Sequence, residues 1–350
     1  MPRAERSMVP DATPTSYYGH PILKAPVWKW PIPTYLFTGG LAAGTALVGA
    51  GAHAGGNRLL ARRASLGTLG AVAVSGGLLV KDLGRPSRFH HMLRVVKPTS
   101  PMSVGTWIFS AFSAAAGATA GAELLAGRGK RSRRGARALG GAGLGRPAGR
   151  GLWPALAGAG HLATAGLAPA LATYTGVLLA DTAVPAWHGA RHELPFVFAG
   201  GAAASGGALG VLLAGGGPGP SERGARPRRL AVAGSILEVG AGQVMRRRLG
   251  ELGEPYHQGV AAILSRGSHV ATLVGGAALA GAGAFGAGVF GAGTTGRGAR
   301  RLDVAGSAFI LAGAALERFA VFHAGRQSAS DPKYVVGPQR RRLVPSAAPA

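Results

Sequence analysis

Residues 81–91, KDLGRPSRFHH, lie between two long apolar runs, and residues 97–107, KPTSPMSVGTW, lead into the second run. The first stretch places a lysine and an aspartate directly at the end of an apolar segment. Charged groups at a membrane boundary are costly unless they are paired or functional. This stretch therefore predicts a functional boundary at a membrane surface.

The composition indicates a polytopic membrane protein. The 350 residues are 47% hydrophobic and include 61 glycines. Glycine without a G-X-Y repeat excludes collagen, and long apolar runs exclude general disorder. These runs are about 15–29 residues long, and about 20 residues cross a bilayer as a helix.

The net charge of +25 would suit a nucleic-acid-binding protein, but the positions of the charges argue against that function. Lysine and arginine lie almost entirely between the apolar runs, where they meet anionic lipid and set topology. The basic loops carry no interleaved aromatic residues. We therefore expect the lipid bilayer as a partner and no nucleic acid.

The chain has no cysteine, which limits its redox chemistry. It has no thiolate to hold an iron–sulfur cluster and no site for a c-type haem. Only His161 lies well within an apolar run, and no histidine on another run is an evident partner for a b-type haem. We interpret His161 as a packed, hydrogen-bonded residue and expect this chain to bind no metal or haem.

The sequence predicts an all-α integral membrane protein with about eight transmembrane helices. The segments are approximately 35–54, 64–83, 104–126, 152–180, 194–214, 230–245, 270–292 and 302–322. Residues 1–32 are predicted to be an irregular leader at the membrane face, because six prolines interrupt any helix. Residues 127–151 are expected to be a disordered basic loop and residues 324–350 a polar tail.

Antiparallel crossings determine which helix ends share a membrane face. The start of spans one and three and the end of spans two and four lie together, and the opposite face is expected to carry only basic loops. The loop with the fewest basic residues, 181–193, places both termini outside. The shared face holds Tyr35, Thr38, Lys81, Asp82, Arg85, His90, Ser103, Tyr174, Thr175 and Asp181.

This face suits a quinone headgroup. Tyr174 and Asp181 are seven residues apart, which places them on one side of a helix, roughly 10 Å apart. A tyrosine hydroxyl can bond a carbonyl oxygen, and ionisable groups can pass protons to water. Simpler interpretations stay open: an interface role for Tyr174, a structural pair of Asp82 with Arg85, and solvated surface positions for Asp181 and His90.

Glu238 lies near the middle of a predicted span, where an unpaired carboxylate is costly. It is expected to be protonated, paired or connected to water. Glu238 and Lys81 are the candidates for a proton path.

Several segments resemble the NrfD/polysulfide reductase membrane-subunit family. They are KWPIPTY at 29–35, GGLAAG at 39–44, DLGRPSRF at 82–89 and KPTSPMS at 97–103. The pieces YTG at 174–176, PAW at 185–187 and DPKY at 331–334 agree. The resemblance is dense from about residue 17 to residue 112.

The resemblance implies two four-helix bundles, residues 33–181 with the quinone site and residues 182–323. It implies electron exchange between menaquinone and a four-cluster ferredoxin-like iron–sulfur subunit, itself connected to a molybdopterin oxidoreductase, in a bacterial plasma membrane. A fourth-helix tyrosine binds quinone in the family and matches Tyr174. The family's first-helix ligand is represented here only by Tyr35 and Thr38.

The expected function is therefore a quinone-reactive membrane anchor. Tyr174 would bond the quinone, Asp82 and Arg85 would organise the pocket and proton uptake, and Asp181 and His90 would line its mouth. The iron–sulfur subunit would dock over the face that carries the leader and the tail. A secondary transporter that uses Glu238, or a purely structural anchor, are the alternatives.

Overall fold

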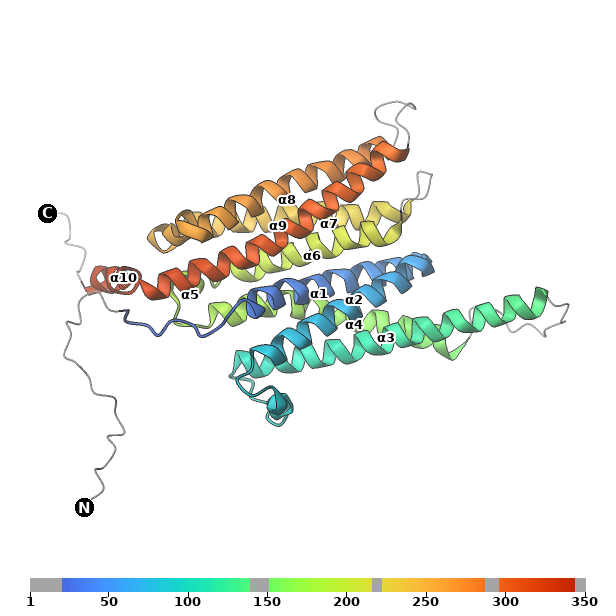
Figure 1. The fold of residues 1–350 in the computed structure, drawn as a ribbon, viewed down its shortest axis with the longest axis horizontal. Coiled ribbons are helices and arrows are strands. Elements are labelled where there is room, and N and C mark those ends of the chain that lie inside the picture. Colours follow the sequence, from blue (N-terminus) through green and yellow to red (C-terminus); the bar gives the residue numbers. More distant parts are fainter. Residues whose placement is uncertain (1–20, 139–150, 216–221, 287–295, 344–350) are drawn as a thin grey trace, which may run out of the picture.

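The computed structural model describes residues 21–138, 151–215, 222–286 and 296–343, and every regular element in these ranges is a helix (Figure 1). The long helices are α1 (Pro31–Ala54), α2 (Arg58–Asp82), α3 (Pro101–Ala138), α4 (Leu152–Ala180), α6 (Leu194–Ala214), α7 (Glu222–Leu249), α8 (Gly259–Gly286) and α9 (Gly296–Ser330). The short helices are η1 (Pro86–Leu93), α5 (Pro185–Gly189), η2 (Gly250–His257) and α10 (Lys333–Leu343).

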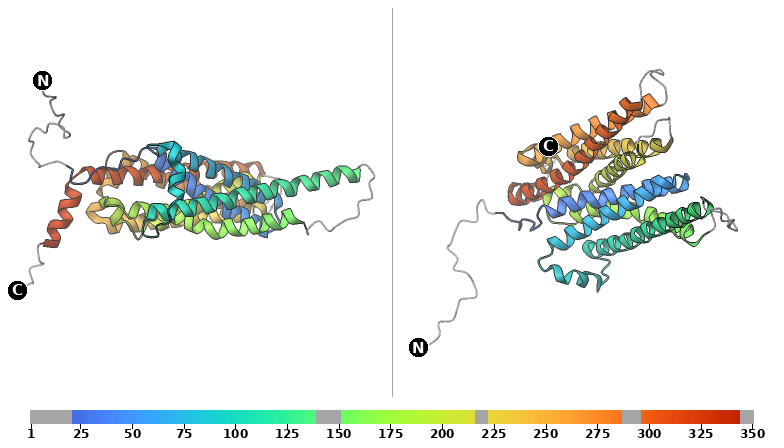
Figure 2. Two further views of the ribbon diagram at one scale, coloured as in Figure 1. Left: turned by 90° about the horizontal axis from the view of Figure 1, so that it is seen from below. Right: turned by 45° about the vertical axis from the view of Figure 1, so that its right-hand side comes forward.

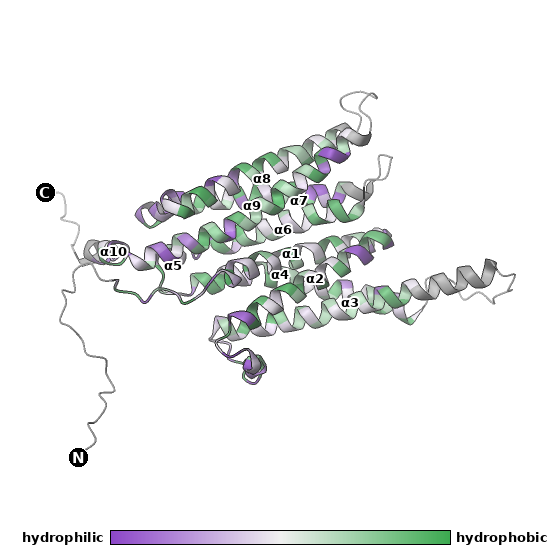
Figure 3. Cartoon of the chain, in the orientation of Figure 1, coloured by the Kyte–Doolittle hydropathy of each residue, from purple (hydrophilic) through white to green (hydrophobic). Residues whose placement is uncertain are grey.

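Six described helices are long and apolar enough to cross a membrane: α1, α2, α3 as far as Gly127, α4, α6, and α9 from Gly298. Apolar residues follow these helices along much of their length (Figure 3). The predicted all-α, multi-pass membrane protein is thus confirmed. The sixth and seventh predicted spans form α7 and α8, of 28 residues each, and a count of eight crossings stays a prediction.

Three helix boundaries differ from the sequence-based expectation. Helix α1 begins at Pro31, inside the predicted leader, because proline is compatible with the first turn of a helix. Helix α3 continues through Ala138 into the predicted basic loop, since arginine, lysine and alanine favour helix. The predicted polar tail contains the end of α9 and then α10. Residues 1–20 and 139–150 lie outside the described residues.

Helices α1 and α6 pack directly against each other. Helices α2 and α4 also pack on α1, and helices α7 and α9 also pack on α6. The helices run roughly along one direction, and the end of α3 extends beyond the others (Figure 2). A Cβ on Gly44 would collide with the carbonyl group of Ala202, and one on Gly206 would collide with the backbone of Gly44. Small residues on both helices therefore let α1 and α6 approach closely.

The described part of the leader contacts both halves of the molecule at one end. Trp28 stacks on Trp187 of α5 with ring centroids 5.7 Å apart, and Trp187 Nε1–H donates to the carbonyl oxygen of Val321, 2.7 Å away. Lys81 Nζ lies 4.6 Å from the ring centroid of Trp30. The leader thereby packs against α5 and the end of α2.

Candidate functional site

Tyr35 and Tyr174 meet at the leader end of the helices. Their hydroxyl groups share a side-chain hydrogen bond, with Tyr35 buried and Tyr174 partly buried. Gly105 of α3 makes room for Tyr174, because a Cβ there would collide with the phenol ring. Phe109 contacts Tyr35 edge to face, with centroids 6.0 Å apart. The predicted meeting of the starts of spans one and three with the end of span four is confirmed.

Thr38 lies one turn beyond Tyr35 and is buried against α2. Its Oγ1 is 2.7 Å from Ser75 Oγ, and the Ser75 hydroxyl donates to the carbonyl oxygen of Ala71 at 2.8 Å. Thr38 Oγ1 also lies 3.4 Å from the carbonyl oxygen of Tyr35, so either hydroxyl can be the donor between Thr38 and Ser75. Thr38 therefore fixes α1 on α2, next to the tyrosine pair.

Asp82 and Arg85 do not form the ion pair that the sequence suggested as one interpretation. Asp82 is partly buried at the end of α2 and accepts a hydrogen bond from the backbone N–H of Lys29. Leu83 then takes an extended conformation, with ψ of 133°, and Arg85 is exposed, with no ion pair to Asp82 within 4.0 Å. The leader thus supplies the partner of Asp82.

The remaining predicted residues of this face lie at the surface. Asp181 is exposed at the end of α4, and His90 is exposed in η1, where its ring contacts Phe89 and His91. The structure therefore brings together Tyr35, Thr38 and Tyr174. Asp82, at the end of α2, is hydrogen-bonded to the leader, and Arg85, His90 and Asp181 are exposed.

Glu238 of α7 is buried and paired, which is one of the three expected states. Its Oε1 is 3.1 Å from Arg318 Nη1 of α9, and Arg318 Nη2 also donates to the carbonyl oxygen of Phe198 at 3.0 Å. Glycines of α6 give the pair its space, since a Cβ on Gly201 would collide with both side chains. A second pair, Arg246 with Glu317 at 3.8 Å, is buried nearby.

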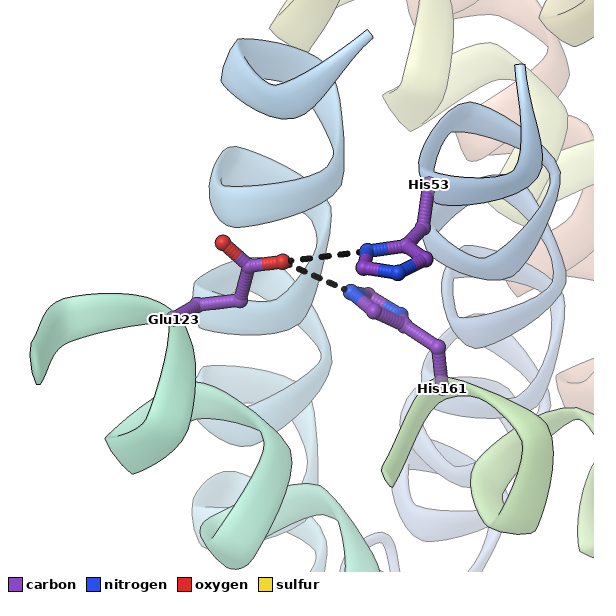
Figure 4. A group of neighbouring side chains, drawn as sticks. All are labelled: His53, Glu123 and His161. Carbon is purple, nitrogen blue, oxygen red and sulfur yellow. Dashed lines mark hydrogen bonds and ion pairs between the residues drawn. The ribbon is translucent and has the colours of Figure 1, made fainter. Parts of the chain in front are cut away.

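A third buried cluster lies at the end of the helices away from the leader, and it joins His53 of α1, Glu123 of α3 and His161 of α4 (Figure 4). Glu123 Oε1 is 3.2 Å from His161 Nε2 and 3.4 Å from His53 Nδ1. The two imidazole centroids are 4.8 Å apart. His161 and Glu123 are buried, whereas the His53 side chain keeps 20% of its surface exposed.

This cluster corrects two expectations. The face opposite the tyrosines does not carry only basic loops, and His161 does have a histidine close by on another span. The rings are nevertheless too close together for a haem to lie between them. The ends of spans one and three and the start of span four share that face, so the same antiparallel argument that found the tyrosines could have found His53 and Glu123.

A protein-family model described as polysulphide reductase, NrfD, matches residues 21–328 of the chain. No curated protein matches the chain. Because the match covers nearly all of the sequence, the chain belongs to the NrfD family, whose members are membrane subunits of oxidoreductase complexes.

Proposed function

We propose that this NrfD-family chain is the membrane-anchor subunit that exchanges electrons between menaquinone or menaquinol and an iron–sulfur partner. The observation that carries the proposal is the hydrogen-bonded pair of Tyr35 and Tyr174, set against Gly105 at one end of the helices. Asp82, Arg85, His90 and Asp181 lie at this same end.

The tyrosine pair fits a quinone headgroup. Two hydroxyls that share one hydrogen bond leave one O–H uncommitted, and that group can donate to a carbonyl oxygen. Tyr174 is only partly buried, and Phe109, Leu78 and Leu79 supply partly buried apolar surface nearby. Menaquinone, when bound, would supply reversible two-electron chemistry, and this chain would bind and orient it.

Asp82 is the proposed proton-exchanging group of the site. It lies at the membrane boundary, partly buried, with the leader's Lys29 as hydrogen-bond donor. Arg85, His90 and Asp181 are exposed at the same end, where they would connect the mouth of the site to water. Lys81, held over Trp30, is proposed to act with Asp82 on the proton path.

Glu238 is proposed as an inner group of the proton path. Its Oε2 and the Nε of Arg318 are buried and have no hydrogen-bond partner among the described residues. Buried polar atoms without protein partners are satisfied by ordered water. Water at these two atoms would connect the ion pair to a proton route. Glu238→Gln should slow the proton uptake that accompanies quinone reduction and leave quinone affinity unchanged, which vesicle proton-uptake assays can measure.

We further propose that a four-cluster ferredoxin-like subunit docks on the face formed by the leader, α5 and α10, and connects to a molybdopterin oxidoreductase in a bacterial plasma membrane. The Trp28–Trp187 stack and the bond from Trp187 to Val321 give this face a defined shape. An ordered docking surface near Tyr174 would keep the electron-transfer distance short.

The test is electron transfer in the complex purified from native membranes in mild detergent. A menaquinol analogue should reduce the partner's iron–sulfur clusters. Tyr174→Phe removes one hydrogen bond and should weaken quinol affinity about 5- to 10-fold. Asp82→Asn should slow turnover with little change in affinity.

Tyr256→Phe is the matched control, because the Tyr256 hydroxyl is buried in η2 without a hydrogen-bond partner among the described residues. Unchanged quinol turnover in both Tyr174→Phe and Asp82→Asn would overturn the proposal. A chain that purifies alone, free of iron and indifferent to quinol would also contradict it.

A further inference from the structure

We propose that His53, Glu123 and His161 form a binding site for a divalent transition metal of the zinc class, separate from the tyrosine site. The candidate ligand atoms of the three side chains all lie within 4.8 Å of one another (Figure 4). Zinc bonds of about 2.0–2.2 Å in tetrahedral geometry place neighbouring ligand atoms about 3.3 Å apart. The distances from Glu123 Oε1 to the two imidazole nitrogens, 3.2 and 3.4 Å, match that spacing.

The charge at Glu123 supports a cation. The carboxylate is buried, and no lysine or arginine among the described residues lies within 4.0 Å of it. A buried carboxylate needs a positive partner. His53 Nδ1 faces Glu123 Oε1 at 3.4 Å, and with the ring proton on Nε2 its lone pair is available to a metal.

The donor set selects the class of metal. Two imidazoles and one carboxylate suit zinc and its neighbours, whereas magnesium and calcium prefer oxygen donors alone. Three protein ligands leave a fourth position for water. His161 also lines a cavity about the size of one water molecule, together with the hydroxyl-bearing residues Ser65, Thr68, Thr119 and Thr164.

The position of the cluster gives an ion access to it. His53 is one residue from the end of α1, and its side chain is partly exposed. A metal arriving from the loop side would meet His53 first and then the buried pair of Glu123 and His161. Because the tyrosine pair occupies the opposite ends of α1 and α4, the two sites can be tested independently.

Cobalt is the probe, because its ligand-field absorption reports coordination by nitrogen and oxygen. The purified complex, stripped with a chelator, should bind one Co²⁺ at this cluster, and Zn²⁺ should displace it. Loss of a directly bound ligand should cost at least as much affinity as loss of an outer-shell partner, roughly 100-fold. We expect that loss in His161→Ala, in Glu123→Gln and in His53→Ala.

His192→Ala is the control, since His192 is an exposed histidine and should leave cobalt affinity unchanged. A variant with His90→Ala and His91→Ala removes the exposed histidine pair, whose rings are 4.5 Å apart, and should also keep the signal.

The proposal is overturned if the folded wild-type complex takes up no stoichiometric cobalt, or if the spectrum survives in all three cluster variants. Should His161→Ala fail to fold, Glu123→Gln and His53→Ala carry the test, because one is isosteric and the other lies at a helix end. Cobalt binding that persists in Tyr174→Phe would separate this site from the quinone proposal.

Discussion

Two buried carboxylates of similar exposure, Glu123 and Glu238, are handled differently in the two halves of the molecule. Glu238 faces a guanidinium, which carries its charge at every accessible pH, and Arg318 is further fixed by the carbonyl group of Phe198. Glu123 faces two imidazoles, which are neutral or charged according to their surroundings and are common metal ligands.

The difference indicates two uses of a buried charge. A carboxylate with a permanent cation has its charge compensated inside the protein, so losing that cation is costly for stability. A carboxylate with imidazoles can exchange its counter-charge for a proton or a metal, so the same geometry becomes a binding site.

The largest expected effect comes from breaking the permanent pair. Arg318→Ala should lower the free energy of unfolding by about 3–5 kcal/mol, because it leaves Glu238 buried without a cation. His161→Ala should cost less, about 1–3 kcal/mol, since His53 still contacts Glu123. Unfolding midpoints of the detergent-purified chain measure both.

Removing both charges provides the control for this prediction. Glu238→Gln combined with Arg318→Met should recover much of the lost stability, because a buried pair contributes little compared with apolar packing. An Arg318→Ala variant no less stable than His161→Ala would remove the distinction between the two carboxylates.

A smaller effect is expected from the glycines beside each cluster. Gly201→Ala should destabilise the chain by about 1–3 kcal/mol, because the new Cβ would displace Glu238 and Arg318. Gly49→Ala would bring a Cβ to 3.3 Å from His161 Cε1, and the higher helix propensity of alanine, up to about 1 kcal/mol, opposes that crowding. If Gly201→Ala and Gly49→Ala lose equal stability in thermal unfolding, the Glu238 pair is not the more tightly packed of the two clusters.

The smallest effect is expected from an exposed ion pair, which contrasts with the two buried carboxylates. Lys333 Nζ lies 2.9 Å from Glu254 Oε2, and the hydrogen bond from Lys333 lowers the pKa of Glu254. Because this pKa is lowered on folding, the contribution to the docking of α10 is complete above the ordinary glutamate pKa of about 4.3 and is lost as the pH falls through the lowered pKa.

Hydrogen exchange of the α10 amides as a function of pH measures this contribution. The wild type should lose protection slightly in the acidic range, and Glu254→Gln should show no such step. High salt should weaken the effect, because exposed pairs are screened. A salt-independent step would show that the pair is less exposed than the structure indicates.

Sequence reasoning predicted the long helices and, within the first four, the helix ends at which Tyr35 and Tyr174 lie together. Tyr35 and Tyr174 were predicted to share a face, and the structure joins their hydroxyls. The pairing of Asp82 with Lys29 was not predicted, because the leader has no periodicity that would place it. Glu123 was not singled out, since a single glutamate near the end of an apolar run resembles an ordinary helix terminus.

The sequence by itself determined the membrane class and the helix ends that meet, because apolar length and alternating direction follow from local composition, and its motifs indicated the family. Only the tertiary structure decided which charges pair. Glu238 and Arg318 are 80 residues apart, and Glu123 and His161 are 38 apart. Each pair depends on how neighbouring helices are rotated about their axes. Close backbone contacts fix that rotation, including those at Gly44, Gly200 and Gly206, and no pattern within one helix specifies it.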